Sequence, residues 1–472
     1  MVFSSLTFLL LFLPITLAGY YLLPGKYKNG WLVFSSLVFY ASGEPLFVFL
    51  FIAEILWNWF MGLMVGNSTS QVKKKASLIL CAAGDIAVLG VFKYANFFTE
   101  TVTTLTTGHP VSLNIILPIG ISFYTFQAIS YVVDIYRGEA PQRNPLYVAL
   151  YLALFPQLIA GPIVRYDQIH PQLQERPFSI DDVSEGFMRF CRGLCKKVLL
   201  ANNLAIVADL VFDTYNDQVL PAPVLWMGVI SYTLQIYFDF SGYSDMAIGL
   251  ARMFGFHIPE NFRDPYLSVN GKDFWRRWNI SLSSWFRDYV YIPLGGSRHG
   301  TAVTIRNLVI VWALTGLWHG AGWTYIVWGL LWGILLILEK FLILPETRGA
   351  FFRRAYRVAI LLWIMLLMTI FRAESFAVAV GIITGLFSPS RWLLCASQGS
   401  LTYFWFIQAI PWLIAGIFFS SSLPKAIKRR LETGWTGKYM IPAGAFVLFA
   451  LLLLAISFLV NGSYNPFLYF QF

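Results

Sequence analysis

The sequence predicts an all-α integral membrane protein that crosses the bilayer many times. Its 472 residues are 57% hydrophobic and only 12% charged, whereas a water-soluble protein carries roughly 25% charged residues. Many apolar runs also reach about 18 residues, the length needed to cross about 30 Å of hydrocarbon. We therefore expect a single integral membrane domain over residues 1–472, not the two or three soluble domains that this length would otherwise suggest.

Twelve apolar segments are candidate spans, and allowing for re-entrant segments the prediction is about 11–13 helices in or across the membrane. The first lies at the N-terminus, which has no basic region and no small-residue cleavage site, so we expect a span there and not a removed signal peptide. The candidate spans are residues 5–23, 29–43, 46–66, 77–98, 112–135, 198–213, 222–253, 306–320, 323–344, 357–371, 401–421 and 441–460.

Lysine and arginine residues lie in short clusters between these spans, as cytoplasmic loops require. Lys26 and Lys28 follow the first span and Lys73–Lys75 follow the third, whereas residues 99–111 and 213–221 contain neither Lys nor Arg. This alternation predicts that both termini are extracytoplasmic. The net charge of +10 comes from such clusters, so it indicates membrane orientation and not a nucleic-acid partner.

Three regions do not fit a simple crossing. Residues 154–162 are apolar but contain two prolines and a glycine, a backbone tolerated at membrane depth only when protein or a water-filled cavity surrounds it, so we expect a re-entrant or interfacial segment. Residues 164–186 are predicted to form a polar cytoplasmic loop. Residues 254–305 mix Trp with Arg and contain no clean span, which predicts an interfacial aromatic-basic segment on the cytoplasmic side.

His319 is the leading candidate for a functional side chain. It lies thirteen residues after Arg306, hence about 20 Å along a helix at 1.5 Å per residue, and the chain is expected to turn back at Gly320-Ala321-Gly322. An ionisable side chain inside the membrane is costly and usually faces a cavity or a partner. The alternative is a neutral structural histidine that bonds a backbone carbonyl.

The remaining histidines and the cysteines give weaker signals. His109, His170, His257 and His299 fall in or beside predicted loops, where exposure to solvent explains them. Neither an HExxH motif nor a zinc-like Cys/His spacing is present, so no metal site is predicted. The four cysteines are expected to be small buried hydrophobic side chains, not disulfides or redox groups; they are Cys81, Cys191, Cys195 and Cys395.

A lone histidine can act as a general base when a second polar group orients it. Spacing alone does not choose among Asn279, Asp288, Asp245 and Asp239. The last two lie in one long apolar stretch, and intramembrane carboxylates would equally suit a proton-coupled transporter or flippase without bond chemistry. The aromatic-basic residues 272–298 could hold a phosphorylated or nucleotide-bearing donor, or could face lipid headgroups.

A long central block of the sequence resembles a known enzyme family. Residues 274–296, Phe-Trp-Arg-Arg-Trp-Asn-Ile-Ser-Leu-Ser-Ser-Trp-Phe-Arg-Asp-Tyr-Val-Tyr-Ile-Pro-Leu-Gly-Gly, are followed by Leu-Trp-His-Gly at 317–320. Together they resemble the membrane-bound O-acyltransferase (MBOAT) family and, within it, the alginate O-acetyltransferase (AlgI-like) type. The opening Met-Val-Phe-Ser-Ser, the Ala-Gly-Pro-Ile at 160–163 and the closing Phe-Leu-Tyr-Phe-Gln-Phe at 467–472 carry the resemblance to both ends.

The resemblance implies a ring of helices around a central funnel, with His319 as the catalytic histidine. A second polar position of the family falls on Asn279, where bacterial polysaccharide-acetylating members often have histidine. Asparagine cannot shuttle a proton, so the expected mechanism has His319 as the sole base, with Asn279 orienting the imidazole or the acyl carbonyl. The residues expected to bind substrate or donor are Arg276, Arg277, Trp278, Arg287, Asp288 and Trp318.

The resemblance further implies an acetyltransferase of a bacterial inner membrane, with acetyl-CoA as donor substrate and no bound cofactor. The expected acceptor is an extracytoplasmic polysaccharide, alginate-like or a cell-wall glycan, or a partner protein that relays the acyl group; membrane lipids surround the chain. Two alternatives stay open. One is transfer of D-alanyl or another acyl group to teichoic acid or lipid, and the other is the transporter or flippase described above.

Overall fold

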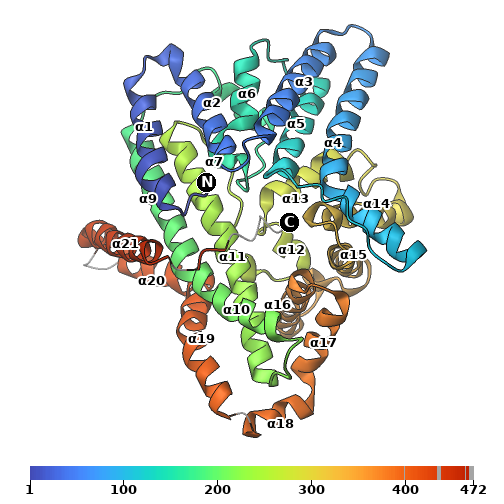
Figure 1. The fold of residues 1–472 in the computed structure, drawn as a ribbon, viewed down its shortest axis with the longest axis vertical. Coiled ribbons are helices and arrows are strands. Elements are labelled where there is room, and N and C mark those ends of the chain that lie inside the picture. Colours follow the sequence, from blue (N-terminus) through green and yellow to red (C-terminus); the bar gives the residue numbers. More distant parts are fainter. Residues whose placement is uncertain (398, 433–436, 463, 467–472) are drawn as a thin grey trace. The chain divides into compact units, whose positions relative to one another are not determined.

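The computed structural model describes residues 1–397, 399–432, 437–462 and 464–466. Every regular element within these residues is a helix, so the prediction of an all-α protein is confirmed. The closing motif at 467–472 lies outside the described residues. The chain forms two compact units: unit 1 comprises Met1–Phe190 with Tyr243–Glu260, and unit 2 comprises Cys191–Gly242 with Asn261–Phe472. Figure 1 shows the path of the chain through its helices.

Several helices of the described residues are long and apolar enough to cross a membrane, which confirms a multi-pass membrane protein. They number seven, and two shorter apolar helices, Phe8–Leu22 and Phe376–Phe387, accompany them. The predicted total of twelve crossings and the predicted orientation of the termini remain predictions. The seven are Phe47–Asn67, Gln71–Thr107, Gly300–His319, Trp323–Ile343, Ala350–Arg372, Tyr403–Ser420 and Ala443–Val460.

Unit 1 consists of packed helices from the first part of the chain. Helices α3, α4 and α5 contact one another. The elements are the π-helical η1 (Phe8–Phe12), α1 (Leu13–Leu22), α2 (Gly25–Ala41), α3 (Phe47–Asn67), α4 (Gln71–Thr107), α5 (Ile121–Arg137), α6 (Pro145–Ala153), α7 (Phe155–Leu158), α8 (Tyr166–Ile169), the 3₁₀ turn η2 (His170–Gln172), most of α9 (Ile180–Cys195) and the end of α11 (Ala222–Met253).

The predicted span 112–135 is wrong at its start, because α5 begins only at Ile121. Gly120 precedes the helix with φ of 76°, in the left-handed region that glycine adopts without steric cost. A Cβ atom at this position would also lie 2.8 Å from the carbonyl oxygen of Leu158. Backbone conformation and close packing at Gly120 therefore delay the helix, although the preceding residues are apolar.

The proline-broken segment 154–162 forms no long helix and is enclosed by protein, and its re-entrant or interfacial position stays a prediction. It follows α6, contains only the single turn α7, and every residue from 150 to 164 is buried. Gly161 approaches the turn so closely that a Cβ atom there would lie 2.4 Å from the Cα atom of Gln157. The environment matches the condition under which irregular backbone is tolerated at membrane depth.

The predicted polar loop 164–186 is wrong over its last residues, because α9 starts at Ile180. The Ser179 hydroxyl accepts a hydrogen bond from the backbone N–H of Asp182 at 3.2 Å, which caps the helix. Asp181 and Asp182 then place negative charge in the first turn, where the helix dipole favours it. The polar composition that suggested a loop is that of a capped helix N-terminus.

Asp182 joins α9 to the end of α11 through a charged hydrogen bond. The Arg252 Nε donates to Asp182 Oδ1 at 2.8 Å, and the His257 Nε2 lies 3.3 Å from the same oxygen. The hydrogen bond from Arg252 lowers the pKa of the Asp182 carboxyl from its ordinary value of 3.8. Since the folded-state pKa is the lower one, the stabilisation is complete above pH 4 and is lost as the pH falls through the folded pKa.

We expect Asp182→Asn to lower the free energy of unfolding at pH 7 by about 1 kcal/mol, the scale of a partly exposed ion pair. The measurement is thermal unfolding in detergent, which should show the difference from wild type shrinking below pH 4. Asp181→Asn, which neutralises the exposed neighbouring carboxyl, should have the smaller effect. An equal difference in thermal stability between Asp182→Asn and wild type at pH 7 and at pH 3.5 would contradict this assignment.

Unit 2 contains the remaining helices. One of them, α17, was missed by the sequence prediction because its twelve residues are too few for a span. The elements are η3 (Lys196–Ala201), α10 (Asn202–Thr214), most of α11, η4 (Pro265–Leu267), α12 (Gly271–Trp275), α13 (Ile280–Phe286), η5 (Arg287–Tyr291), α14 (Gly300–His319), α15 (Trp323–Leu338), η6 (Glu339–Ile343), η7 (Pro345–Thr347), α16 (Ala350–Arg372), α17 (Phe376–Phe387), α18 (Pro389–Ser397), α19 (Gly399–Ser420), α20 (Leu423–Glu432) and α21 (Gly437–Val460).

The absence of a clean span in residues 254–305 is confirmed. Between the end of α11 and the start of α14 the chain forms only short elements, of which the longest, α13, has seven residues. They are nevertheless well packed: Phe274 and Trp275 on α12 are both buried. Residues 261–305 of this segment are therefore packed aromatic and basic structure within unit 2.

Candidate active site

The hairpin of α14 and α15 places His319 at the last residue of α14. The two helices lie side by side (Figure 1), and the chain turns at Gly320–Gly322, as predicted. Glycines set their spacing: a Cβ atom at Gly316 would lie 2.4 Å from the Tyr325 carbonyl oxygen, and one at Gly329 would lie 2.3 Å from that of Trp312. A larger residue at either position would push the helices apart and displace His319.

We expect Gly329→Leu to abolish activity and to lower thermal stability in detergent. A Cβ at this position overlaps backbone atoms, which cannot move aside as a flexible side chain can, and overpacking of this kind costs about 1–3 kcal/mol or more. Gly90→Ala on α4 is the matched control, because nothing lies within 4 Å of its added methyl group and alanine favours a helix over glycine. Normal activity in Gly329→Leu would refute the close approach of the helices.

Three aromatic rings surround the His319 imidazole, which is only 6% exposed. The ring centroids of Trp318, Trp328 and Phe371 lie 4.9, 4.9 and 5.2 Å from its own, each in an edge-on arrangement. Such contacts restrict the orientation of the imidazole and keep bulk water from its faces. His319 is therefore a deeply placed side chain with a defined ring plane.

The same aromatic cluster extends from His319 to α12. Trp328 contacts Trp275 at 5.9 Å between centroids, and Trp275 contacts Trp312 at 4.7 Å. Phe274 stacks on Trp332 of α15 at 5.1 Å with an interplanar angle of 1°. The hairpin that carries His319 and the segment that leads to Asn279 therefore belong to one packed core.

Asn279 occupies the N-cap position of α13 but does not cap it. Its backbone is left-handed, with φ of 41° and ψ of 57°, and its side chain makes no capping hydrogen bond. The residue is 1% exposed, and neither Oδ1 nor Nδ2 has a hydrogen-bond partner within the described residues. Because a buried amide without partners is costly, this side chain is a candidate for a contact with a ligand.

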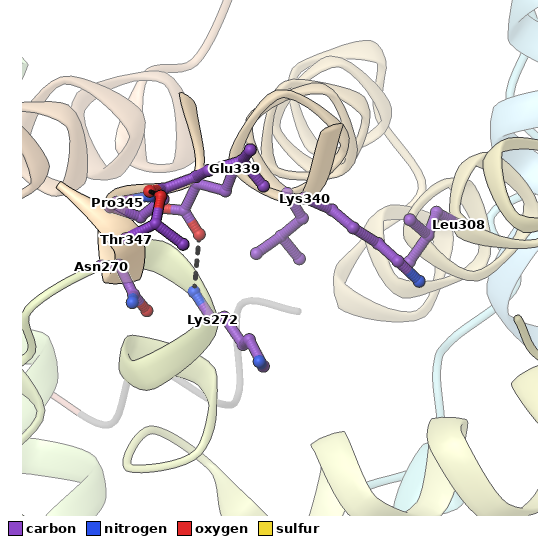
Figure 2. Close-up of a pocket in the computed structure, with 9 residues that line it drawn as sticks. Asn270, Lys272, Leu308, Glu339, Lys340, Pro345 and Thr347 are labelled. Atoms are coloured by element: carbon purple, nitrogen blue, oxygen red, sulfur yellow. Dashed lines mark hydrogen bonds between the residues drawn. The ribbon is translucent and has the colours of Figure 1, made fainter. Parts of the chain in front are cut away.

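A buried carboxylate fixes the start of α12. Glu339 accepts hydrogen bonds from the backbone N–H of Gly271 at 2.6 Å and of Lys272 at 3.1 Å, and from the Tyr356 hydroxyl at 2.9 Å. Figure 2 shows the bond to Lys272 at the edge of a cavity of about 340 Å³. Lys340 extends along the same cavity (Figure 2), so two cationic side chains border it.

A second, larger cavity of about 530 Å³ adjoins the first and shares Lys272, Leu308 and Leu336 with it. Its basic residues are Lys272, Arg276 and Arg287. Its wall follows α14 as far as Thr315, one helical turn before His319. The remaining lining residues are Trp275, Ile280, Leu282, Ser283, Ser284, Phe286, Tyr291, Val311 and Trp312.

The predicted donor-binding residues separate into two groups. Arg276 and Arg287 line the larger cavity, and Trp318 contacts His319. Arg277 and Trp278 are not among the lining residues: the Arg277 Nε donates to Asp273 Oδ1 at 2.9 Å, and the Trp278 ring lies buried against aromatic neighbours such as Phe274 and Phe262.

Asp288 is likewise not among the lining residues of the cavity. It forms a two-pronged ion pair with its neighbour Arg287, with distances of 2.7 and 2.8 Å. The hydrogen bonds that Arg287 donates to Asp288 raise the pKa of the Arg287 guanidinium above its ordinary value. The carboxylate therefore orients a cation that does line the cavity.

The two intramembrane aspartates considered as partners of His319 each have a cation close by. Asp239 lies 2.6 Å from the Lys197 Nζ, with both side chains 3% exposed. Asp245 lies 2.9 Å from Arg189, which also binds Glu260. These pairs place a positive charge beside each carboxylate, and among the four sequence candidates Asn279 alone has a side chain without a hydrogen-bond partner within the described residues.

Sequence reasoning did not single out Lys272, Trp275, Trp312 or Thr315, all of which line the larger cavity. Lys272 was detectable, since it lies in the aromatic-basic stretch that the sequence marked as a donor site. Thr315 and Trp312 lie four and seven residues before His319 on α14, so helical periodicity could have placed them on one face. Nothing in the spacing distinguishes Trp275 from the other tryptophans of the segment.

The fold is that of a multi-pass membrane protein, and the chain belongs to the membrane-bound O-acyltransferase family, whose model matches residues 136–382. It is therefore an acyltransferase, as the resemblance of its central block predicted. The chain is 42% identical to the probable alginate O-acetylase AlgI of Pseudomonas putida, over all of both chains.

Two further relatives differ in what their names say they modify. A peptidoglycan O-acetyltransferase of Helicobacter pylori is 36% identical, over 84% of this chain and 81% of its own. A teichoic acid D-alanyltransferase of Bacillus subtilis is 29% identical, over 60% of this chain and 73% of its own. The similarity therefore extends over most of the chain for relatives that transfer acetyl groups and over a smaller part for one that transfers D-alanine.

Proposed function

We propose that the protein transfers an acetyl group from acetyl-CoA, bound at the cytoplasmic side of a bacterial inner membrane, to a hydroxyl on an extracytoplasmic polysaccharide. The names of the relatives similar over most of the chain, an alginate O-acetylase and a peptidoglycan O-acetyltransferase, support this substrate class. The charge distribution of the loops supports a cytoplasmic position for the aromatic-basic segment, with both termini outside.

The observation that carries the proposal is the position of the basic cavity, whose wall on α14 ends one helical turn before His319. Thr315 lines the cavity and His319 follows four residues later, about 6 Å along the helix axis. A donor whose charged end lies among Lys272, Arg276 and Arg287 would have its acyl end directed toward the imidazole. No protein-bound cofactor is required, because acetyl-CoA is consumed as a substrate.

The cavity provides both kinds of contact that a nucleotide-bearing thioester needs. Arginine and lysine pair with phosphates, and the indole and phenol rings of Trp275, Trp312 and Tyr291 offer surfaces for a base or for the apolar part of the donor. The smaller cavity extends this volume past Lys272 toward Lys340. Membrane lipids would cover the open sides of the two cavities.

In the proposed reaction a single residue, His319, accepts and returns the proton. The imidazole of His319 accepts the proton of the acceptor hydroxyl while the hydroxyl oxygen forms a bond to the thioester carbonyl carbon, a role worth roughly 10²–10⁴ in rate. Asn279 donates a hydrogen bond to the carbonyl oxygen as it gains negative charge. The C–S bond then breaks, the imidazolium returns its proton to the thiolate, and the products are the ester and the free thiol of CoA.

The immediate acceptor is either the polysaccharide or a partner protein that carries the acyl group to it. The D-alanyltransferase among the relatives keeps D-alanyl transfer as the second candidate.

The transferred group can be identified in cells. Cells that express the protein are supplied with radiolabelled acetate or D-alanine, and surface glycans are analysed by mass spectrometry. Acetyl esters that depend on the protein support the proposal, whereas D-alanyl esters overturn it.

We expect Arg276→Ala and Arg287→Ala each to raise the KM for acetyl-CoA about tenfold, since a hydrogen bond to a charged group is worth roughly 1.5–3 kcal/mol. The value of kcat should change little, because neither side chain contacts the reacting carbonyl in this scheme. Donor turnover is measured as thiol release in inverted membrane vesicles. Arg354→Ala, which removes an exposed cation from α16, is the control, and equal effects at all three positions would argue against a donor site.

A further inference from the structure

The backbone on both sides of Asn279 is held by one neighbouring segment, residues 261–263. The Asn261 carbonyl oxygen accepts from the Ile280 N–H at 3.0 Å, and the Arg263 N–H donates to the Arg277 carbonyl oxygen at 2.9 Å. Asn279 therefore lies between two backbone hydrogen bonds to the same segment. These two hydrogen bonds stabilise the left-handed conformation of Asn279, which a non-glycine residue rarely adopts.

Asn261 also provides the helix cap that Asn279 does not. The Asn261 Oδ1 accepts from the Ser281 N–H at 3.0 Å and from the Ser281 hydroxyl at 2.9 Å. The side chain of an N-cap residue normally accepts from the second or third N–H of the helix, and Ser281 is the second residue of α13. Asn261 thus satisfies the N–H that Asn279 would otherwise bond.

The consequence concerns the side chain of Asn279. If Asn279 capped α13 itself, its Oδ1 would be occupied and its backbone would be extended. With the cap supplied from outside, the backbone is left-handed and the amide is available. Asn261 is fully buried and contacts the backbone of α13 and not the cavity, so any effect on the reaction must act through the residues it holds.

We propose that Asn261 is a positioning residue for the acyl transfer: by capping α13 in place of Asn279, it fixes the left-handed backbone that turns the Asn279 amide toward the substrate. This inference rests on the proposed function, in which Asn279 donates to the acyl carbonyl. It assigns a role to the segment just before η4, which lies outside the long central block of the sequence.

The test is a double-mutant cycle with Asn279→Gly, in which glycine keeps the left-handed backbone and removes the amide. Asn261→Leu should lower kcat for thiol release from acetyl-CoA about 10²-fold, with an unchanged KM, and should have no further effect in the Asn279→Gly background. Asn261→Asp, which keeps the acceptor oxygen for Ser281, should restore most of the activity. The figure of about 10² corresponds to loss of one hydrogen-bond donor to a developing oxyanion.

Asn203→Ala is the matched control, because this buried amide bonds the carbonyl oxygens of Val198 and Leu199, away from α13. Its effect, whatever its size, should multiply with that of Asn279→Gly. If the effects of Asn261→Leu and Asn279→Gly also multiply, or if Asn261→Leu changes KM alone, the positioning role is wrong. If Asn279→Gly itself retains full activity, the proposed role of Asn279 fails instead. Ser281→Ala, which keeps the N–H bond, provides a milder variant should Asn261→Leu not fold.

Discussion

Replacing His319 by alanine is expected to lower kcat by 10²–10⁴, the contribution of a positioned general base, while the protein still inserts and binds donor. No other group in the proposed scheme can accept the hydroxyl proton, since asparagine at 279 does not titrate. The measurement combines thiol release from acetyl-CoA in membrane vesicles with the acetyl content of surface glycans, both normalised to the amount of protein in the membrane.

His109→Ala is the control for this experiment, because His109 is exposed in the segment between α4 and α5. It should leave kcat unchanged. His319→Ala removes an imidazole that packs between three rings, so thermal unfolding should be compared in parallel. Full surface acetylation by a normally inserted His319→Ala protein would remove His319 from the mechanism.

Asn279→Gly is expected to lower kcat about 10²-fold, the effect of removing one hydrogen-bond donor from a developing oxyanion, without loss of stability. Glycine adopts the left-handed conformation at no steric cost. Removal of a buried amide that has no partner among the described residues also offsets the small cavity left behind. The free energy of unfolding should therefore stay within about 1 kcal/mol of the wild-type value.

Asn114→Gly is the matched control, because Asn114 has the same left-handed backbone, with φ of 54°, at an exposed position. It should change neither kcat nor stability. Asn279→His places an ionisable side chain at this position, and histidine tolerates this conformation. If Asn279→Gly lowers the free energy of unfolding by more than about 1 kcal/mol together with kcat, the amide has a structural role and not a catalytic one.

The membrane class and most helices could be predicted from the sequence because hydrophobic length is a strong local signal. The missed features depend on three-dimensional context. The start of α5 is set by the left-handed backbone at Gly120 and its contact with Leu158, and the first turns of α9 depend on the Ser179 cap. Composition alone does not distinguish a capped helix N-terminus rich in Asp from a polar loop.

The candidate site likewise contains residues that the sequence could predict and residues that it could not. His319 stood out because an ionisable residue in an apolar helix is rare, and Arg276 and Arg287 because they belong to a dense aromatic-basic segment. Asp239 was indistinguishable from a functional carboxylate until its ion pair with Lys197 was seen, and the two residues lie forty-two positions apart in sequence. Pairing at such separations is a property of the folded chain.

The discontinuity of unit 1 has a consequence for biosynthesis. Its first 190 residues leave the ribosome before residues 243–260, which complete the unit. One contact that closes it joins Gly186 to Gly249, where a Cβ atom at Gly249 would lie 2.5 Å from the Gly186 carbonyl oxygen. Domains fold as units during synthesis. Unit 1 therefore stays incomplete in the membrane while residues 191–242 of unit 2 are inserted. The nascent protein thus passes through a stage in which the Gly186 surface of α9 lacks its packing partner on α11.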